Sequence, residues 1–460
     1  MPITTEVAHP VVGARPARDP AVPAPPPVGL GPAPPPARIG LAVLTIALMP
    51  FPIVLRAWGN PKLPYDYVTM VFPVDVALAG LLVAGLGPLG RRLRSRQAGA
   101  GMALWILFAA VMTVAWAVHP SSRGLHTVFE LWGTAVLAGT VAEALAGAFS
   151  GLVLGALGIV AVIESAWAAT QLVRGSGLGL TGLGEDLHPL WPFSASVVGP
   201  MGSMVHPYVL AGLALVASAA LAWRATSATR PAPWLGAAAL AAAPVGYTFS
   251  RAGLVGIVFL SGGFAAAALR PSQQRSRCVA AALALCIGTA VPAAVWNNGW
   301  LSRASQTTSA TNAGALTTER TQLVHESLVL LGTNPLAGIG PGQYVPALQR
   351  HFKVESDKRI ANFRPVHNVI LLVGAEGGVA ALLVMVAFFL VVGWRALRAG
   401  PIATGVYLAY LPFCMLDHFP YSFPQGLVLT ACWLGLLDVI GRKRTPTGAE
   451  AVSEPLPAPV

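Results

Sequence analysis

Long apolar runs, separated by shorter polar segments, make up most of the chain. About 20 apolar residues in a helix cross the hydrocarbon core of a bilayer, and a helix pairs its backbone polar groups within itself. The pattern therefore predicts an all-α polytopic membrane protein with about twelve transmembrane helices. The runs cover approximately residues 40–55, 68–86, 102–118, 128–145, 152–172, 208–223, 234–247, 252–269, 279–295, 369–392, 402–415 and 426–440.

One long polar interval, residues 296–366, separates the ninth run from the tenth and ends in a basic cluster of Lys358, Arg359 and Arg364. We expect it to form one large extracytoplasmic loop between helices nine and ten. The pattern divides the chain into a Pro-rich cytoplasmic arm (1–37), helices one to nine (38–295), the large loop (296–366), helices ten to twelve (367–441) and a cytoplasmic tail (442–460).

Composition supports a location in lipid, because charged residues make up 10% of the chain and mean hydropathy is +0.66, whereas soluble domains carry about 25% charged residues. The net charge of +11 is gathered in short loops. If the N-terminus is cytoplasmic, all these clusters face the cytoplasm, as the positive-inside rule requires. We therefore expect a multi-pass protein of the cytoplasmic (inner) membrane with both termini in the cytoplasm, and no nucleic-acid partner. The clusters are Arg91–Arg96, Arg224 and Arg230, Arg270–Arg277, Arg395 and Arg398, and Arg442–Arg444.

Neither the termini nor the cysteines predict chemistry. Residues 1–37 are rich in Pro and Ala, which predicts an arm without a packed core. The four cysteines fall inside or beside apolar runs and lack metal-ligand spacing, so we expect no structural disulfide, no metal site and no cofactor.

Acidic residues within or near the runs either relay protons or, as the simpler interpretation, form hydrogen bonds with neighbouring helices. They are Glu130, Glu143, Glu164 and Glu376.

Two arginines are candidates on the outer face. Arg251 ends an apolar run, where a guanidinium is costly unless it reaches the interface, pairs or faces a wet cavity. It is either an interfacial anchor or a clamp for phosphate, since arginine offers a planar fork of donors. Arg320 opens an amphipathic segment, and taken alone a local ion pair with Glu319 or Glu326 is the simpler interpretation.

Histidines and glycines near the same face are the other candidates. Gly340 and Gly342 belong to a glycine-spaced turn. This turn is either a plain loop or a site that binds phosphate through backbone N–H groups. His367 is either a hydrogen-bonded interfacial anchor or a general base, because its reference pKa is near neutral. Asn368 can orient His367 or cap the following helix.

The pair Asp417-His418 falls on the same outer face in this topology. Asp417 can hold a histidine in one tautomer, and the plainer interpretation is a polar turn before Pro420.

Three elements together resemble the bacterial O-antigen ligase/polymerase superfamily of integral-membrane glycosyltransferases. They are Thr248–Gly253, Arg320 followed by Asn334–Gly340 and Gly342–Tyr344, and His367-Asn368 followed by Glu376–Gly378. Weaker matches are Glu164-Ser165 with Gln171, Gly202 with His206-Pro207, and Asp417-His418 with Gln425-Gly426. The order and spacing of the set, from the fifth run onward, carry the resemblance.

The resemblance implies a class C glycosyltransferase-like fold and a metal-independent, inverting enzyme. It also implies an oligosaccharide donor on a polyprenyl diphosphate and a saccharide or protein hydroxyl as acceptor. Arg251 and Arg320 match arginines that hold the diphosphate, and His367 matches the histidine that activates the acceptor. The further substrate-binding candidates are Arg364, Asn368, Gly340, Gly342, His206, Asp417 and His418.

Two alternatives stay open. A secondary transporter or flippase of a lipid-linked or anionic substrate would carry charged pairs near the midplane and broken helices. In this sequence most charges lie at helix ends and the large loop lies on one side only, which favours an enzyme. Ligase and polymerase activities are not separable from the sequence.

Overall fold

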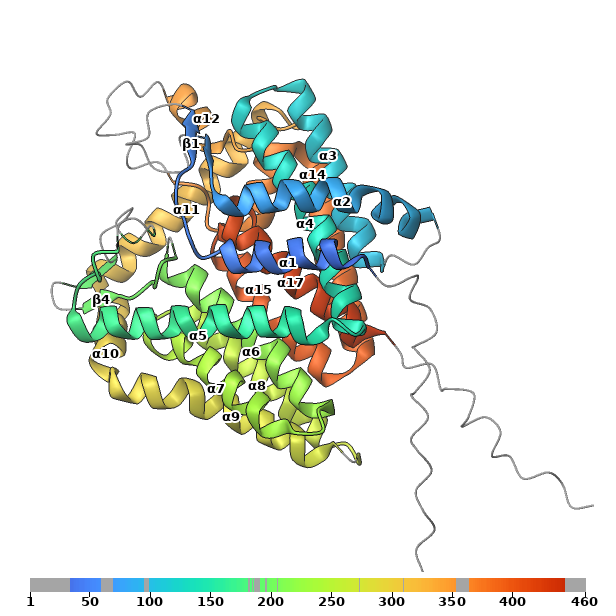
Figure 1. Ribbon diagram of the computed structural model, residues 1–460. Coiled ribbons are helices and arrows are strands. Elements are labelled where there is room, and N and C mark those ends of the chain that lie inside the picture. Colours follow the sequence, from blue (N-terminus) through green and yellow to red (C-terminus); the bar gives the residue numbers. More distant parts are fainter. Residues whose placement is uncertain are drawn as a thin grey trace, which may run out of the picture. The chain divides into compact units, whose positions relative to one another are not determined.

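The computed structural model describes most of the chain, which is helical nearly throughout (Figure 1). The Pro-rich arm, the C-terminal tail, and Lys358 and Arg359 of the basic cluster lie outside the described residues. Those described are 34–58, 69–94, 99–180, 183, 185, 191–194, 197–204, 206–272, 274–308, 310–352 and 364–442.

Each of the twelve apolar runs forms a helix. The helices are α1 (Pro36–Leu48), α2 (Pro73–Arg94), α3 (Ala100–Val118), α4 (Ser122–Ala146), α5 (Ser150–Arg174), α6 (Pro207–Ser227), α7 (Pro231–Tyr247), α8 (Arg251–Ala268), α9 (Arg275–Val295), α14 (Val369–Ala399), α15 (Pro401–Leu416) and α17 (Pro424–Gly441). Several begin with proline, whose fixed φ suits the first helical position. Within the described ranges, nine helices are long and apolar enough to cross a membrane, and α1 and α15 are shorter apolar helices. The all-α polytopic class is confirmed, and the count of twelve spans stays a prediction.

The polar interval expected as a loop is itself largely helical. It contains α10 (Asn297–Thr308), α11 (Ala310–Thr333) and α12 (Tyr344–Phe352). α11 buries Leu323 and Leu330, and Ser327 Oγ donates to the Leu371 carbonyl of α14 at 3.0 Å. The polar composition kept this segment out of the lipid-spanning pattern, and packing on α14 favours a helix.

Four short strands form two antiparallel hairpins, and one short helix lies near the C-terminal end. β1 (Arg56–Trp58) pairs with β2 (Thr69–Val71), and β3 (Trp191–Ser194) pairs with β4 (Val197–Gly199). The short helix is α16 (Phe419–Ser422). The sequence analysis did not predict these elements, which are too short to carry a periodic signal.

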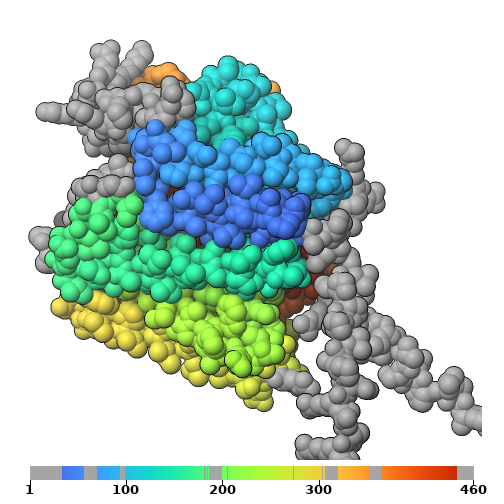
Figure 2. Space-filling view, in the orientation of Figure 1, coloured from blue at the N-terminus to red at the C-terminus, as the bar shows by residue number. Residues whose placement is uncertain are grey.

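The centre of the bundle is formed by α4, α6 and α17. In the most apolar stretch of each of these helices, 83%, 89% and 78% of the residues are buried, against 22% for α9. Figure 2 shows α2, α1 and α5 side by side across one face. α9 exposes Val279, Leu283, Ile287 and Val291 at four-residue spacing, a stripe suited to lipid contact. All four cysteines are free, as predicted.

α14 reverses sharply at Gly378, whose φ of 74° and ψ of −172° are not helical. A Cβ at Gly374 would lie 3.3 Å from the Cβ of Leu382, whereas residues eight apart in a straight helix are about 12 Å apart along the axis. The predicted tenth run, 369–392, is therefore two helical segments. The sequence did not show this, because both segments are equally apolar.

α8 and α15 pack antiparallel at very close range. A Cβ at Gly256 would lie 2.5 Å from the Ala409 carbonyl oxygen, and one at Gly263 would lie 2.7 Å from that of Pro401. Small residues permit such close approach between membrane helices. This pairing places Arg251, the first residue of α8, at the same end of the bundle as the end of α15.

The opposite end of the bundle holds ion pairs made by the basic clusters. Glu143 pairs with Arg38 and, at 3.2 Å, with Arg92, and Asp438 pairs with Arg442 at 2.5 Å. Arg92 and Arg442, from two of the clusters expected on the cytoplasmic side, thus pair at this end. Which end faces the cytoplasm stays a prediction.

Candidate functional site

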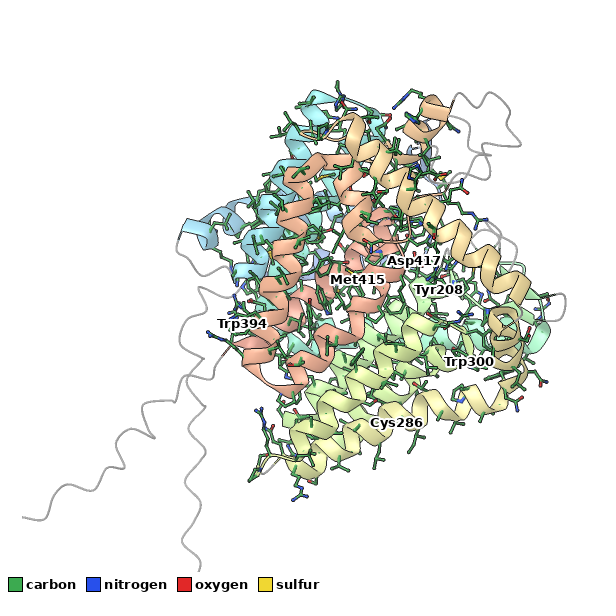
Figure 3. All side chains as sticks on the ribbon, turned by 180° about the vertical axis from the view of Figure 1, so that it is seen from behind. Tyr208, Cys286, Trp300, Trp394, Met415 and Asp417 are labelled. Carbon is green, nitrogen blue, oxygen red and sulfur yellow. The ribbon has the colours of Figure 1, made fainter. Side chains whose placement is uncertain are left out.

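The candidate site lies at the end of the bundle where α8 and α14 begin and α15 ends. Figure 3 labels Asp417 and Met415, with Trp394 toward the opposite end of the bundle. Asn368 joins the two elements, because its Oδ1 accepts a hydrogen bond from the N–H of Leu371 at 3.0 Å and its Nδ2 donates to the Met415 carbonyl at 3.2 Å. The helix-cap interpretation of Asn368 is confirmed.

Two histidines and a carboxyl meet beside this cap. The rings of His367 and His418 are edge to face, with centroids 5.3 Å apart. The N–H of His418 donates to Asp417 Oδ1 at 2.7 Å, and its Nδ1 lies 2.6 Å from Ser422 Oγ. Burial raises the pKa of Asp417, and its electrostatic interactions with His367 and, more weakly, Arg320 oppose that shift. His367, Asp417, His418 and Arg320 therefore share one region.

The electrostatics of His418 place two arginines and another histidine in this region. Burial lowers the pKa of His418 well below its ordinary value, and the electrostatic interaction with His367 lowers it further. The charges of His206, Arg123 and Arg364 act in the same direction. The imidazole of His418 is therefore neutral at neutral pH, and the surrounding cations favour binding of an anion.

His367 offers a ring nitrogen for chemistry. Its Nδ1 is buried and has no hydrogen-bond partner among the described residues. A buried polar atom without a partner costs about 1–3 kcal/mol, so such atoms in native structures call for a ligand, a water or a catalytic explanation. This nitrogen is suited to accept a proton from a bound hydroxyl.

His206 is positioned by residues of α5. Its side chain caps α6, accepting the N–H of Tyr208 at 3.1 Å. The preceding turn is held by Gln171, which accepts from Gly202 N at 2.9 Å and donates to the Gly202 carbonyl at 2.7 Å. Glu164 accepts from the N–H and the hydroxyl of Ser203. Glu164 and Gln171 thus supply hydrogen-bond partners to the turn that precedes α6.

Arg251 follows an unusual turn. Phe249 has a φ of 53°, uncommon for a residue with a side chain, and its buried ring packs edge to face with Trp300 of α10 at 5.7 Å. Ser250 Oγ accepts the N–H of Gly253 at 3.1 Å and so caps α8. The aromatic contact and the cap hold exposed Arg251 at the start of α8.

The glycine-spaced turn uses its backbone donors to hold α14. The N–H of Ile339 donates to the Ala375 carbonyl at 3.0 Å and that of Gly340 to the Glu376 carbonyl at 2.9 Å. The N–H of Gly342 donates to the Glu376 carboxylate. Phosphate would compete with these bonds, and a substrate-binding role for Gly340 and Gly342 stays a prediction.

Arg123 was missed in the sequence analysis. A Cβ at Gly342 would lie 2.8 Å from Cγ of Arg123, so the two residues are in contact. One cavity is lined by Arg123, Gly342, Glu376, Tyr421 and Ser422. Tyr421 OH donates to Glu376 Oε2 at 2.7 Å. Since Ser422 also contacts His418, the cavity adjoins the histidine pair.

The sequence just before Arg123 contains a signal for the start of a helix. Ser121 Oγ accepts the N–H of Gly124 at 3.0 Å, which starts α4 at residue 122 rather than 128. Serine is a preferred N-cap, so the sequence Ser121-Ser122-Arg123 could have placed the arginine in the first turn of a helix.

Comparison with known proteins bears on the same residues. Residues 235–386 match the family model described as O-antigen ligase. The matched segment runs from α7 into α14 and contains Arg251, Arg320 and His367. No curated protein matches the chain. The resemblance expected from the motifs is confirmed.

Proposed function

We propose that this chain, whose residues 235–386 match the O-antigen ligase family model, transfers or polymerises a glycan at the outer face of the cytoplasmic membrane. The donor is an oligosaccharide on a polyprenyl diphosphate, and the acceptor is a hydroxyl of a saccharide or a protein. The observation that carries the proposal is the meeting of cationic side chains from separate segments around the unpaired nitrogen of His367. A diphosphate is an anion that such a cluster would bind.

The arginines act on the leaving group in this proposal. Arg251 and Arg320 bind the diphosphate and stabilise the negative charge that grows on it as the bond between the anomeric carbon and the phosphate oxygen breaks. Hydrogen bonds to charged groups contribute about 1.5–3 kcal/mol each, and donors already in place at the developing charge lower the barrier further. The arginines, rather than a metal ion, supply positive charge at the diphosphate.

His367 acts on the acceptor. Its free ring nitrogen takes the hydroxyl proton as the acceptor oxygen attacks the anomeric carbon from the side opposite the leaving diphosphate, so the configuration inverts. Asp417 stabilises the imidazolium that forms, and the ring of neutral His418 holds the ring of His367 in place.

Arg123 and Arg364 extend the cationic surface toward the cavity beside His418. We assign them to binding of the donor headgroup or of acidic sugars. His206 and Asn368 complete the binding surface, the latter also by anchoring the start of α14.

The alternative, a transporter or flippase, gains one supporting feature, the broken helix α14. The break serves another contact, however, because the N–H of Val379 after it donates to the Pro335 carbonyl at 2.8 Å. Uptake of a lipid-linked or anionic substrate into vesicles, without new glycosidic bonds, would favour the transporter.

The test of the proposal is glycan transfer by membranes carrying Arg320→Ala or His367→Ala. Loss of the general base lowers the rate about 10²–10⁴-fold, and the arginine variant is expected to lose transfer while inserting normally. Arg398→Ala is the matched control, because Arg398 lies over Trp394 at the opposite end of α14. Normal glycan products from the Arg320 variant would refute the assignment.

The lipid-linked intermediates of a deletion strain separate the two activities. Accumulation of single repeat units on the carrier indicates a polymerase, and accumulation of long chains on the carrier indicates a ligase.

A further inference from the structure

Three potential metal ligands meet inside the bundle, on α2 and α4. They are Asp75, His126 and Glu130, and one ligand atom from each lies within 4.8 Å of the other two. His126 Nε2 is 3.3 Å from Asp75 Oδ2, and its Nδ1 is 3.7 Å from Glu130 Oε2. The side chains of Asp75 and Glu130 are each 3% exposed, and that of His126 is 10% exposed.

A second observation indicates a ligand here. Asp75 Oδ1 and Glu130 Oε1 are both buried without a hydrogen-bond partner among the described residues, and His126 Nε2 contacts only the Asp75 carboxyl, at 3.3 Å. Asp75 Oδ2 accepts the N–H of Phe72 at 2.8 Å, which fixes the carboxyl at the start of α2. Buried polar atoms normally have partners, so two unpaired carboxyl oxygens beside one imidazole indicate a bound group.

The donor set indicates that this group is a cation. Two carboxyl groups and an imidazole offer oxygen and nitrogen lone pairs that converge within 4.8 Å, and these are the ligand types that a divalent ion takes. Two carboxylates and a neutral imidazole balance the charge of one such ion.

We infer that Asp75, His126 and Glu130 bind a divalent transition-metal ion, for which Zn²⁺ is the appropriate probe. Imidazole nitrogen and carboxylate oxygen are ordinary zinc ligands, and zinc binds such sites more tightly than manganese or iron does. The sequence analysis predicted no metal site, because it looked for short ligand spacings and Asp75 lies on a different helix. The ion joins the start of α2 to the turn of α4 that follows Arg123, and so holds that arginine beside the cavity.

The experiment is a zinc-binding measurement on the purified full chain. Chelator-washed protein in detergent is equilibrated with Zn²⁺, passed through a desalting column and analysed for metal by mass spectrometry. We expect one ion per wild-type chain, and at least a tenfold weaker affinity for His126→Gln and Glu130→Gln. The matched controls, His325→Gln on the exposed side of α11 and Asp438→Asn at the opposite end, are expected to keep the ion.

A second measurement does not depend on the folding of a variant. Zn²⁺ is expected to raise the unfolding temperature of the wild-type protein, since a ligand that binds only the folded state stabilises it, and to leave that of Glu130→Gln unchanged. Absence of stoichiometric zinc on the wild-type chain, or equal binding by wild type and both ligand variants, overturns the inference. Neither result bears on glycan transfer, which is assayed separately.

Discussion

The carboxylate of Glu185 accepts hydrogen bonds from α5 and from the segment that follows it. Its two oxygens accept hydrogen bonds from Trp167 Nε1 at 3.1 Å, Gln171 Nε2 at 2.8 Å, and the backbone N–H groups of Leu178 and Leu180 at 2.6 and 2.8 Å. Burial alone would raise the pKa of Glu185, but these bonds lower it to about 2. Because Gln171 also holds the turn before His206, this carboxylate supports one wall of the site.

Acid is therefore expected to weaken the fold through Glu185. An unfolded glutamate has a pKa of about 4.3, so the contribution of Glu185 is fully present above that pH and is lost as pH falls toward 2. Glu185→Gln should lower stability at pH 7 by about 1.5–3 kcal/mol and flatten the dependence of the unfolding temperature on pH between 5 and 3. Thermal unfolding in detergent over that range is the measurement. An identical acid response in both proteins would assign the effect to another group.

At the scale of the element, the reversal of α14 decides where the site lies. At Gly378 the backbone of α14 contacts the backbone of Leu336. A Cβ at Gly378 would lie 2.3 Å from the Leu336 carbonyl oxygen. The first segment of α14 then runs from His367 toward the glycine-spaced turn, which holds Glu376 against Tyr421. Apolar periodicity predicts that such a segment is helical, but it carries no information about a reversal that a single glycine permits.

Gly378→Ala is expected to destabilise the protein. A side chain at this positive φ costs about 1–3 kcal/mol, and the clash with Leu336 adds to that cost. The measurement is the unfolding temperature in detergent. Gly155→Ala in α5 is the control, since nothing lies within 4 Å of a Cβ there and alanine is better in a helix by about 0.5–1 kcal/mol. Equal behaviour of the two variants would show that the reversal is not required.

At the scale of the whole molecule, the bundle has two ends with different chemistry. One holds the ion pairs of Glu143 and Asp438, and the other holds the histidines and arginines of the candidate site. In the orientation that the positive-inside rule predicts, the site faces away from the cytoplasm, the side on which the proposed lipid-linked donor would have to be presented.

Cysteine labelling tests this orientation. Leu336 is 86% exposed near the glycine-spaced turn, and Leu269 is 82% exposed just after α8 at the opposite end. In a Cys286→Ala background, which removes the exposed native thiol, a membrane-impermeant maleimide should label Leu336→Cys in intact cells and Leu269→Cys only after lysis. The reverse pattern would invert the topology, and labelling of both in intact cells would contradict a two-ended arrangement.

The sequence by itself determined which residues form apolar helices and which polar motifs are candidates for the chemistry. Charged side chains are costly in hydrocarbon, so apolar runs and basic clusters identify the helices and their ends, and the motifs around Arg251, Arg320 and His367 are local in the chain. Only the tertiary structure decided which ends meet, including the approach of α8 to α15 and of Asp75 to His126. The physical reason is that these contacts depend on glycine-permitted close approach and on charges from distant segments, which no local pattern encodes.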